Sequence, residues 1–75
     1  MSTATMVSAI DQIGETAGEV WQCLDLQGRM SMAQLIKSID APRDVVMQAV
    51  GWLAREDKIE IDETTRGRQI FLRQD

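Results

Sequence analysis

The spacing of the apolar residues changes once along this chain, just after Lys58, and that change restricts the folds open to it. Before Lys58 the apolar residues recur every three or four positions, which is the period of an amphipathic α-helix. After Lys58 they alternate with polar residues, which is the period of a β-strand. The sequence therefore predicts an α+β fold, in which a helical region is followed by a short β region.

The first predicted helix covers residues 11–27. Ser8, followed three positions later by Asp11, is a capping pair for its start, and Gly28 is a suitable stop. Two glycines in its first half weaken the helix there. One apolar face follows from the spacing of Ile13, Ala17, Val20 and Leu24.

Two further helices are predicted at residues 32–39 and 42–57, after a short extended link with the sequence RMSM. Ser31 and Gln34 form a capping box for the second helix, and Pro42 suits the first turn of the third. The second helix repeats its apolar residues at Met32, Leu35, Ile36 and Ile39. The third buries a stripe of Val46, Ala49, Val50 and Leu53, widened on one flank by Val45 and Trp52.

Two alternating runs follow the third helix. Ile59 and Ile61 alternate with acidic residues, and Ile70 and Leu72 alternate with polar ones. The stretch TTRG between the runs ends in Gly67, so the two runs are predicted to be the strands of a β-hairpin.

A chain of 75 residues fits one small domain, which we expect to cover residues 9–75 after a flexible N-terminus at 1–8. One cysteine, Cys23, cannot form an internal disulfide, and the absence of histidine removes the usual zinc ligand. At this size a single core rarely supplies more than about 3–5 kcal/mol, which makes self-association a common source of added stability.

Neither a membrane protein nor an enzyme is expected. The sequence has no charged segment followed by an apolar run, as in a signal peptide, and no apolar stretch long enough to cross a bilayer. We therefore expect a soluble, cytoplasmic protein. Histidine and tyrosine are absent and Cys23 has no predicted base beside it, so we expect no catalytic residues, no metal site and no cofactor.

The net charge of −4 counts against nucleic acid as a partner, but the acidic excess is confined to one end. Residues 1–28 hold four acidic residues and no basic one, whereas residues 29–75 hold eight of each. The part of the chain that contains the second and third helices and the hairpin is therefore neutral.

The order of helix, short strand, helix, tight turn, helix and hairpin resembles a winged helix-turn-helix domain over nearly the whole chain. The resemblance is carried by the Ser31-capped helix, the DAPRD turn, the stretch VVMQAVGWLAREDKIEI and the hairpin IEIDETTRGRQIFLR. AGEVWQCL and AVGWLAREDKI are similar to a narrower family of short, stand-alone bacterial and archaeal winged-helix proteins of uncharacterised function. The resemblance implies three helices with a C-terminal hairpin wing. The narrower resemblance implies a compact module that can form a homodimer, and it supplies no known ligand.

In a helix-turn-helix protein the third helix would enter the major groove of DNA. Arg43, Asp44, Met47 and Gln48 would then meet base edges, for which their chemistry is suitable, and Arg55 lies farther along the same helix. An ordinary helix surface explains the same residues: Asp44 as a capping residue, Arg43 as a solvated cation and Gln48 as a helix former. The pattern favours neither reading strongly.

The hairpin turn offers a second candidate contact with DNA. Thr65, Arg66 and Arg68 at an exposed tip suit binding to phosphates or entry into a minor groove. Alternatively, the arginines balance the acidic residues Glu60, Asp62 and Glu63 of the neighbouring strand. DNA binding by this chain would be modest and salt-dependent, because it offers at most about five phosphate contacts. These are Lys37, Arg43, Arg55, Arg66 and Arg68.

A protein partner is the competing expectation. Gly51 lies on the outer face of the third helix. A glycine is expected at this position either because another element of the chain crosses closely, which is the explanation we prefer, or because a partner packs there. Gly14 and Gly18 form a similar notch beside Trp21, and strand alternation pushes Phe71 away from the core. These five residues are the candidate partner interface, and we expect a homodimer or another protein partner. Our first hypothesis is a DNA-binding module, and the alternative is a protein-interaction or dimerisation module without nucleic-acid binding.

Overall fold

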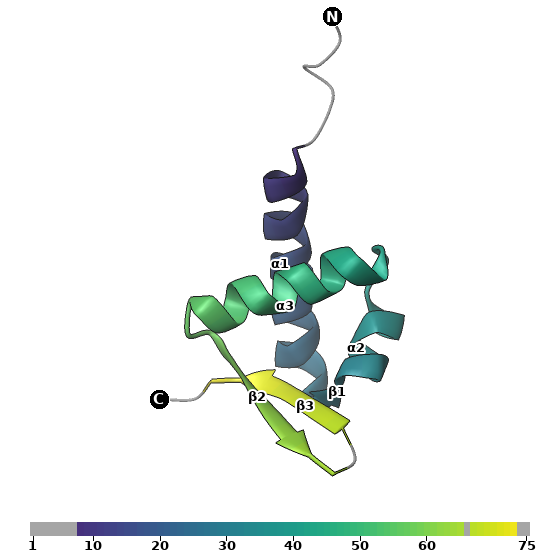
Figure 1. The fold of residues 1–75 in the computed structure, drawn as a ribbon, viewed down its shortest axis with the longest axis vertical. Helices are drawn as coiled ribbons and strands as arrows, with labels where there is room; N and C mark the ends of the chain where they lie inside the picture. Colours follow the sequence, from purple (N-terminus) through teal and green to yellow (C-terminus); the bar gives the residue numbers. More distant parts are fainter. Residues whose placement is uncertain (1–7, 66, 74–75) are drawn as a thin grey trace, which may run out of the picture.

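The computed structural model describes residues 8–65 and 67–73, and within them the chain forms three helices and a three-stranded antiparallel sheet (Figure 1). The flexible N-terminus expected at residues 1–8 lies, except for Ser8, outside the described residues. The predicted α+β class and the three helices followed by a hairpin are confirmed. In chain order the elements are α1 (Ala9–Gln27), β1 (Met30–Ser31), α2 (Met32–Ser38), α3 (Arg43–Arg55), β2 (Ile59–Thr64) and β3 (Gly67–Leu72).

Short-range hydrogen bonds fix both ends of α1. The Ser8 hydroxyl accepts a hydrogen bond of 3.0 Å from the backbone N–H of Asp11, which confirms the capping pair. Gly28 ends the helix with a φ of 80° while its N–H donates to the carbonyl of Leu24 at 2.8 Å. The helix begins two residues earlier than predicted because Ser8 caps it directly.

Helices α2 and α3 follow the predicted order, with corrections at the ends of α3. The capping box of α2 has both of its hydrogen bonds, each of 3.1 Å, between Ser31 and Gln34. Pro42 is the N-cap of α3 rather than a residue of its first turn. The helix also ends at Arg55, short of the predicted residue 57, because Asp57 adopts a left-handed conformation with a φ of 62°.

The sheet contains one strand more than the predicted hairpin. Its order is β1-β3-β2, and all of its pairings are antiparallel. The predicted extended link became β1, in which Met30 pairs with Ile70 and Ser31 pairs with Gln69. The short strand was therefore predicted, but its pairing with β3, which ties the start of α2 to the hairpin, was not.

The core lies where α1 crosses α3 above the sheet (Figure 1). One expected core position is wrong: Trp52 on the flank of the α3 stripe is 37% exposed. Ile61, which alternates with acidic residues on β2, is 39% exposed. Ile61 pairs with the fully buried Ile70, but it lies nearer the hairpin turn than Ile59, which is buried. The side chains with the least exposure come from every helix and from β3: Val20, Leu35, Val46, Ala49 and Ile70.

No helix of the described residues is long and apolar enough to cross a membrane.

Candidate nucleic-acid interface

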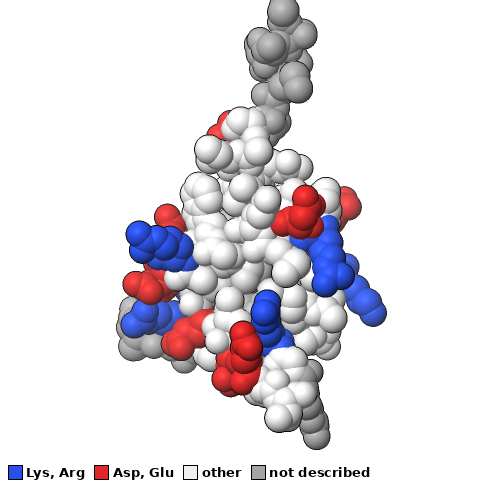
Figure 2. Space-filling view, in the orientation of Figure 1, with Lys and Arg blue, Asp and Glu red and all other residues white. Residues whose placement is uncertain are grey.

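Helix α3 exposes the face that the sequence predicted. Its opposite face is buried against α1, with Val46 and Ala49 fully covered. On the exposed face the middle of the helix is uncharged, as Figure 2 shows over the centre of the molecule. This face is formed by Asp44, Met47, Gln48, Gly51 and Arg55.

Three elements meet beside the start of α3 and form a shallow groove between α2, α3 and the first residues of β3, which we call the basic groove. Lys37 comes from α2, Arg43 from α3 and Arg68 from β3. In Figure 2 basic side chains gather on the right, over α2 and the start of α3, with acidic side chains at the upper edge. The fold thus brings together cations that are up to 31 residues apart in the sequence.

Ion pairing divides the basic residues of the described chain into two groups. Arg29, Lys58, Arg68 and Arg73 each lie within 4.0 Å of a carboxylate oxygen. For Lys37, Arg43 and Arg55 no such partner exists among the described residues. Lys37 and Arg43 are therefore exposed charges in one groove, available to an anionic ligand without first leaving an acidic partner.

The hairpin turn carries less free positive charge than its sequence suggests. Arg68 Nε lies 3.5 Å from a carboxylate oxygen of Glu63, which is the neutralising arrangement that the sequence left open. Because both side chains are at least half exposed, this pair holds Arg68 only weakly. Arg66, the other arginine of the predicted wing contact, lies outside the described residues.

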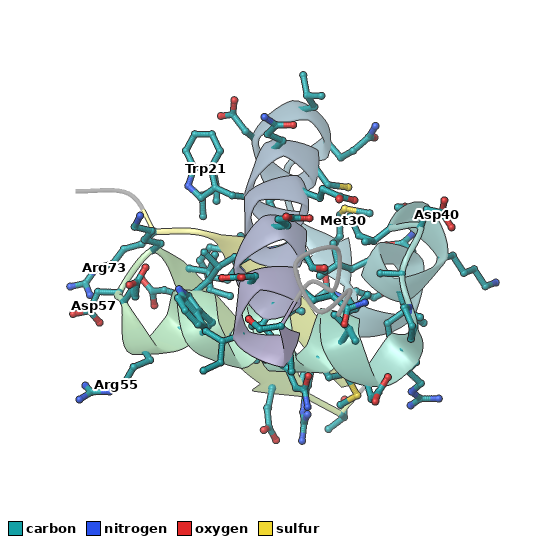
Figure 3. All side chains as sticks on the ribbon, turned by 90° about the horizontal axis from the view of Figure 1, so that it is seen from above. Trp21, Met30, Asp40, Arg55, Asp57 and Arg73 are labelled. Atoms are coloured by element: carbon teal, nitrogen blue, oxygen red, sulfur yellow. The ribbon has the colours of Figure 1, made fainter. Side chains whose placement is uncertain are left out.

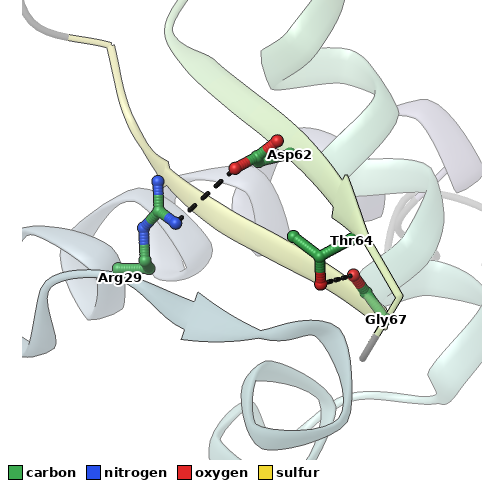
Figure 4. Close-up of polar contacts among 4 residues, drawn as sticks. All are labelled: Arg29, Asp62, Thr64 and Gly67. Carbon is green, nitrogen blue, oxygen red and sulfur yellow. Dashed lines mark hydrogen bonds and ion pairs between the residues drawn. The ribbon is translucent and has the colours of Figure 1, made fainter.

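The turn itself is closed by a side-chain hydrogen bond. Thr64 Oγ1 donates to the carbonyl oxygen of Gly67 at 3.0 Å, and Figure 4 shows this contact at the end of the hairpin. Farther along β2, Asp62 pairs with Arg29 at 3.7 Å. Thr65 is exposed beside the closed turn, where the sequence predicted it.

The glycine of α3 has no structural neighbour that explains it. A Cβ atom built on Gly51 would meet nothing within 4 Å. The preferred explanation from the sequence, a close crossing by the hairpin or α2, is therefore wrong. Gly51 instead leaves a flat, open surface on the exposed face of α3.

The predicted partner interface divides over three places. Gly14, Gly18 and Trp21 line one groove on α1, whereas Gly51 lies on the exposed face of α3. Phe71 is half-buried rather than fully exposed, because the Arg29 guanidinium lies 4.2 Å from the centre of its ring. Strand alternation predicted that Phe71 would point away from the core. It could not predict that Arg29 would cover the Phe71 ring.

Sequence reasoning assigned one residue of this region to the wrong environment. Trp52 lies in the same groove as Trp21, where the sequence had placed it at the edge of the core. Its position at the margin of the apolar stripe of α3 was the available signal, since residues at that margin can face either way.

Among the described residues, no cluster of three histidine, cysteine, aspartate or glutamate side chains could hold a metal ion.

Comparison with known proteins supports the fold. Residues 6–73 match the family described as "Winged helix-turn-helix domain (DUF2582)". The chain is also similar to the uncharacterized protein MJ1608 of Methanocaldococcus jannaschii, with 43% identity over 51 residues. That match covers 64% of this chain and 71% of its relative.

Proposed function

Because the chain belongs to the winged helix-turn-helix domain family DUF2582, we propose that it binds double-stranded DNA, with α3 in the major groove. Winged helix-turn-helix domains generally bind DNA, and this chain has the helix and the hairpin in the arrangement that such binding uses. The observation that carries the proposal is the basic groove, where Lys37 and Arg43 have no acidic partner among the described residues.

Each side of the groove has a distinct role in this proposal. Lys37 and Arg43 bind phosphates on one strand, and Arg68 exchanges its weak pair with Glu63 for a phosphate. Met47 and Gln48 then face the bases, where Gln48 suits adenine and Met47 packs against a thymine methyl group. Asp44 accepts a hydrogen bond from the N–H of Val45 at 3.0 Å and can also accept one from the amino group of a cytosine.

The charges of the groove predict the strength and the salt dependence of binding. With three phosphate contacts per chain, the logarithm of the affinity falls against the logarithm of salt concentration with a slope of about −2.7. Electrostatic binding of this size is modest for one chain, and two linked chains double the slope.

We also place the protein in the cytoplasm, and we assign it no catalytic step, since phosphate and base contacts account for the proposed activity.

A titration of mixed-sequence duplex DNA, followed by fluorescence anisotropy from about 50 to 200 mM salt, tests the proposal. We expect affinity to fall steeply over this range, and we expect Arg68→Ala to lower the slope by about 1 per chain. Arg73→Ala is the matched control, because Arg73 pairs with Asp57 away from the basic groove. Absence of binding at the lowest salt concentration would reject DNA binding and favour the second candidate.

The second candidate function is a protein-interaction module without nucleic-acid binding. One observation favours it: two exposed tryptophans line one groove between α1 and α3, on a chain with a net charge of −4. Exposed tryptophan is typical of the central part of protein interfaces. The two functions are compatible, since the two grooves are lined by different residues.

A further inference from the structure

Four exposed residues of α3 lie one helical turn apart, in a single row along its outer face. Residues four positions apart are neighbours on a helix surface, and this row, which we call the outer row, consists of Arg43, Met47, Gly51 and Arg55. The opposite face of α3 is buried in the core. The outer row therefore has a cation at each end, and between them it has one apolar side chain and one position without a side chain.

The two arginines of the outer row are free of acidic partners. Neither has a carboxylate oxygen within 4.0 Å among the residues that the structure describes. Glu56, which follows Arg55 in the chain, pairs with Lys58 at 3.8 Å and lines the groove between α1 and α3 instead. Figure 3 shows Arg55 pointing away from the molecule, on the opposite side from Trp21 of that groove. Each end of the row can thus bind an anionic group directly.

The packing of the chain does not require a glycine within this row. A Cβ atom at Gly51 would meet nothing within 4 Å. Glycine is among the least favourable residues in the interior of a helix, and no close contact inside the chain offsets that cost here. Because the side chain is missing, the backbone of another molecule can approach α3 more closely at Gly51 than over any other residue type.

The spacing along the outer row matches the width of the major groove of DNA. That groove is about 12 Å wide, and Gly51 lies about 12 Å from Arg43 along the helix axis. The proposed function places Arg43 on the phosphates of one strand, together with Lys37 of the neighbouring α2. If α3 crosses the groove from that strand, Gly51 falls at the opposite edge, beside the backbone of the second strand. Arg55 lies one turn farther on, about 18 Å from Arg43, where it reaches the phosphates of the second strand.

We propose that α3 crosses the major groove along the outer row, and that the missing side chain of Gly51 admits the sugar–phosphate backbone of the second strand. Arg55 binds a phosphate of this strand, as Lys37 and Arg43 do on the first. The inference rests on the proposed function and deepens it, because it makes Gly51 a contact position that sets how closely α3 approaches DNA. The sequence had assigned Gly51 to an interface with a protein partner instead.

Two matched variants, Gly51→Leu and Gly18→Leu, test this contact in the anisotropy titration with duplex DNA. Both glycines lie within helices and have open space around the Cβ position, so leucine should raise the melting temperature of each variant. Gly18 lies in the groove lined by Trp21, away from the outer row. We expect the dissociation constant for DNA to rise about tenfold or more for Gly51→Leu and to stay within about threefold for Gly18→Leu. A loss of binding in a more stable protein cannot be caused by misfolding.

Arg55→Gln tests the contact with the second strand, since it removes the charge and keeps most of the length of the side chain. We expect the magnitude of the salt slope to fall by about 1. Arg73→Gln is the control, because Arg73 is already paired with Asp57. If the unmodified chain binds DNA, equal dissociation constants for the two leucine variants, or an unchanged slope for Arg55→Gln, would overturn this inference and leave the proposed function standing. Absence of binding by the unmodified chain would reject both.

Discussion

The double variant Lys37→Glu/Arg43→Glu is expected to bind duplex DNA on the order of 100-fold more weakly than the unmodified chain at low salt. Both side chains lie in the basic groove, one on α2 and one at the start of α3, and neither has an acidic partner among the described residues. The reversal removes two phosphate contacts and adds repulsion at the same two places. The salt slope should fall by about 2 per chain, because two counterions fewer are released.

A matched variant distinguishes local contacts from total charge. Lys58→Glu/Arg73→Glu also replaces one lysine and one arginine, at exposed positions that are already paired with Glu56 and Asp57. We expect this variant to keep its affinity within about threefold at 150 mM salt, where charges more than about 8 Å from the ligand are largely screened. Circular dichroism of the same variant checks that its fold is unchanged. Equal losses in the two double variants would show that DNA senses only net charge.

Leu35→Ala is expected to destabilise the fold by about 3 kcal/mol or more, since a leucine-to-alanine change in a rigid core leaves a cavity as well as losing apolar contact. Leu35 has no exposed surface and is the buried residue of the seven-residue helix α2. A single core of this size rarely supplies more than about 3–5 kcal/mol, so much of the variant should be unfolded at 25 °C. Urea denaturation followed by circular dichroism measures the loss.

The control for this change is Leu26→Ala on α1. Leu26 is 82% exposed, so the same truncation there should alter the free energy of unfolding by less than about 0.5 kcal/mol. If Leu35→Ala were as stable as Leu26→Ala, the packing of α2 against α3 and the sheet would be wrong. The position of Lys37 in the basic groove would then lose its support, because Leu35 anchors the helix that carries it.

Most of the secondary structure could be predicted because its causes are local. Ser8 and Ser31 start helices through hydrogen bonds that span three residues, and Gly28 ends one with a positive φ. The hairpin follows from alternation and a turn that ends in Gly67. Each of these signals lies within a few residues of the feature that it produces, so one sequence is enough to detect it.

Features that depend on distant partners could not be predicted in the same way. The pairing of Met30 with Ile70 joins residues 40 positions apart, and two residues of strand give no period. The cover of Phe71 by Arg29 and the exposure of Trp52 depend on how the helices cross the sheet. At Gly51, spacing located the residue on the outer face but could not show that no element crosses there.

The candidate site was predicted in its parts but not as an arrangement. The exposed face of α3 follows from helical period, so Asp44, Met47 and Gln48 were identified correctly as surface residues. Lys37 was counted as a possible phosphate contact from its charge alone, and only the fold places it in the same groove as Arg43. Which cations are free and which are paired depends on side-chain positions that no sequence period encodes.

Binding of DNA in the basic groove is tested most directly by mapping where DNA contacts the protein, with backbone amide resonances followed during titration with a mixed-sequence duplex. We expect the largest shifts on α2, the exposed face of α3 and the turn between β2 and β3, around Lys37, Arg43 and Arg68. Resonances of Trp21 and of the start of α1 should stay in place. Shifts centred on the groove lined by Trp21 and Trp52, or no shifts at low salt, would contradict the assignment of the basic groove to DNA.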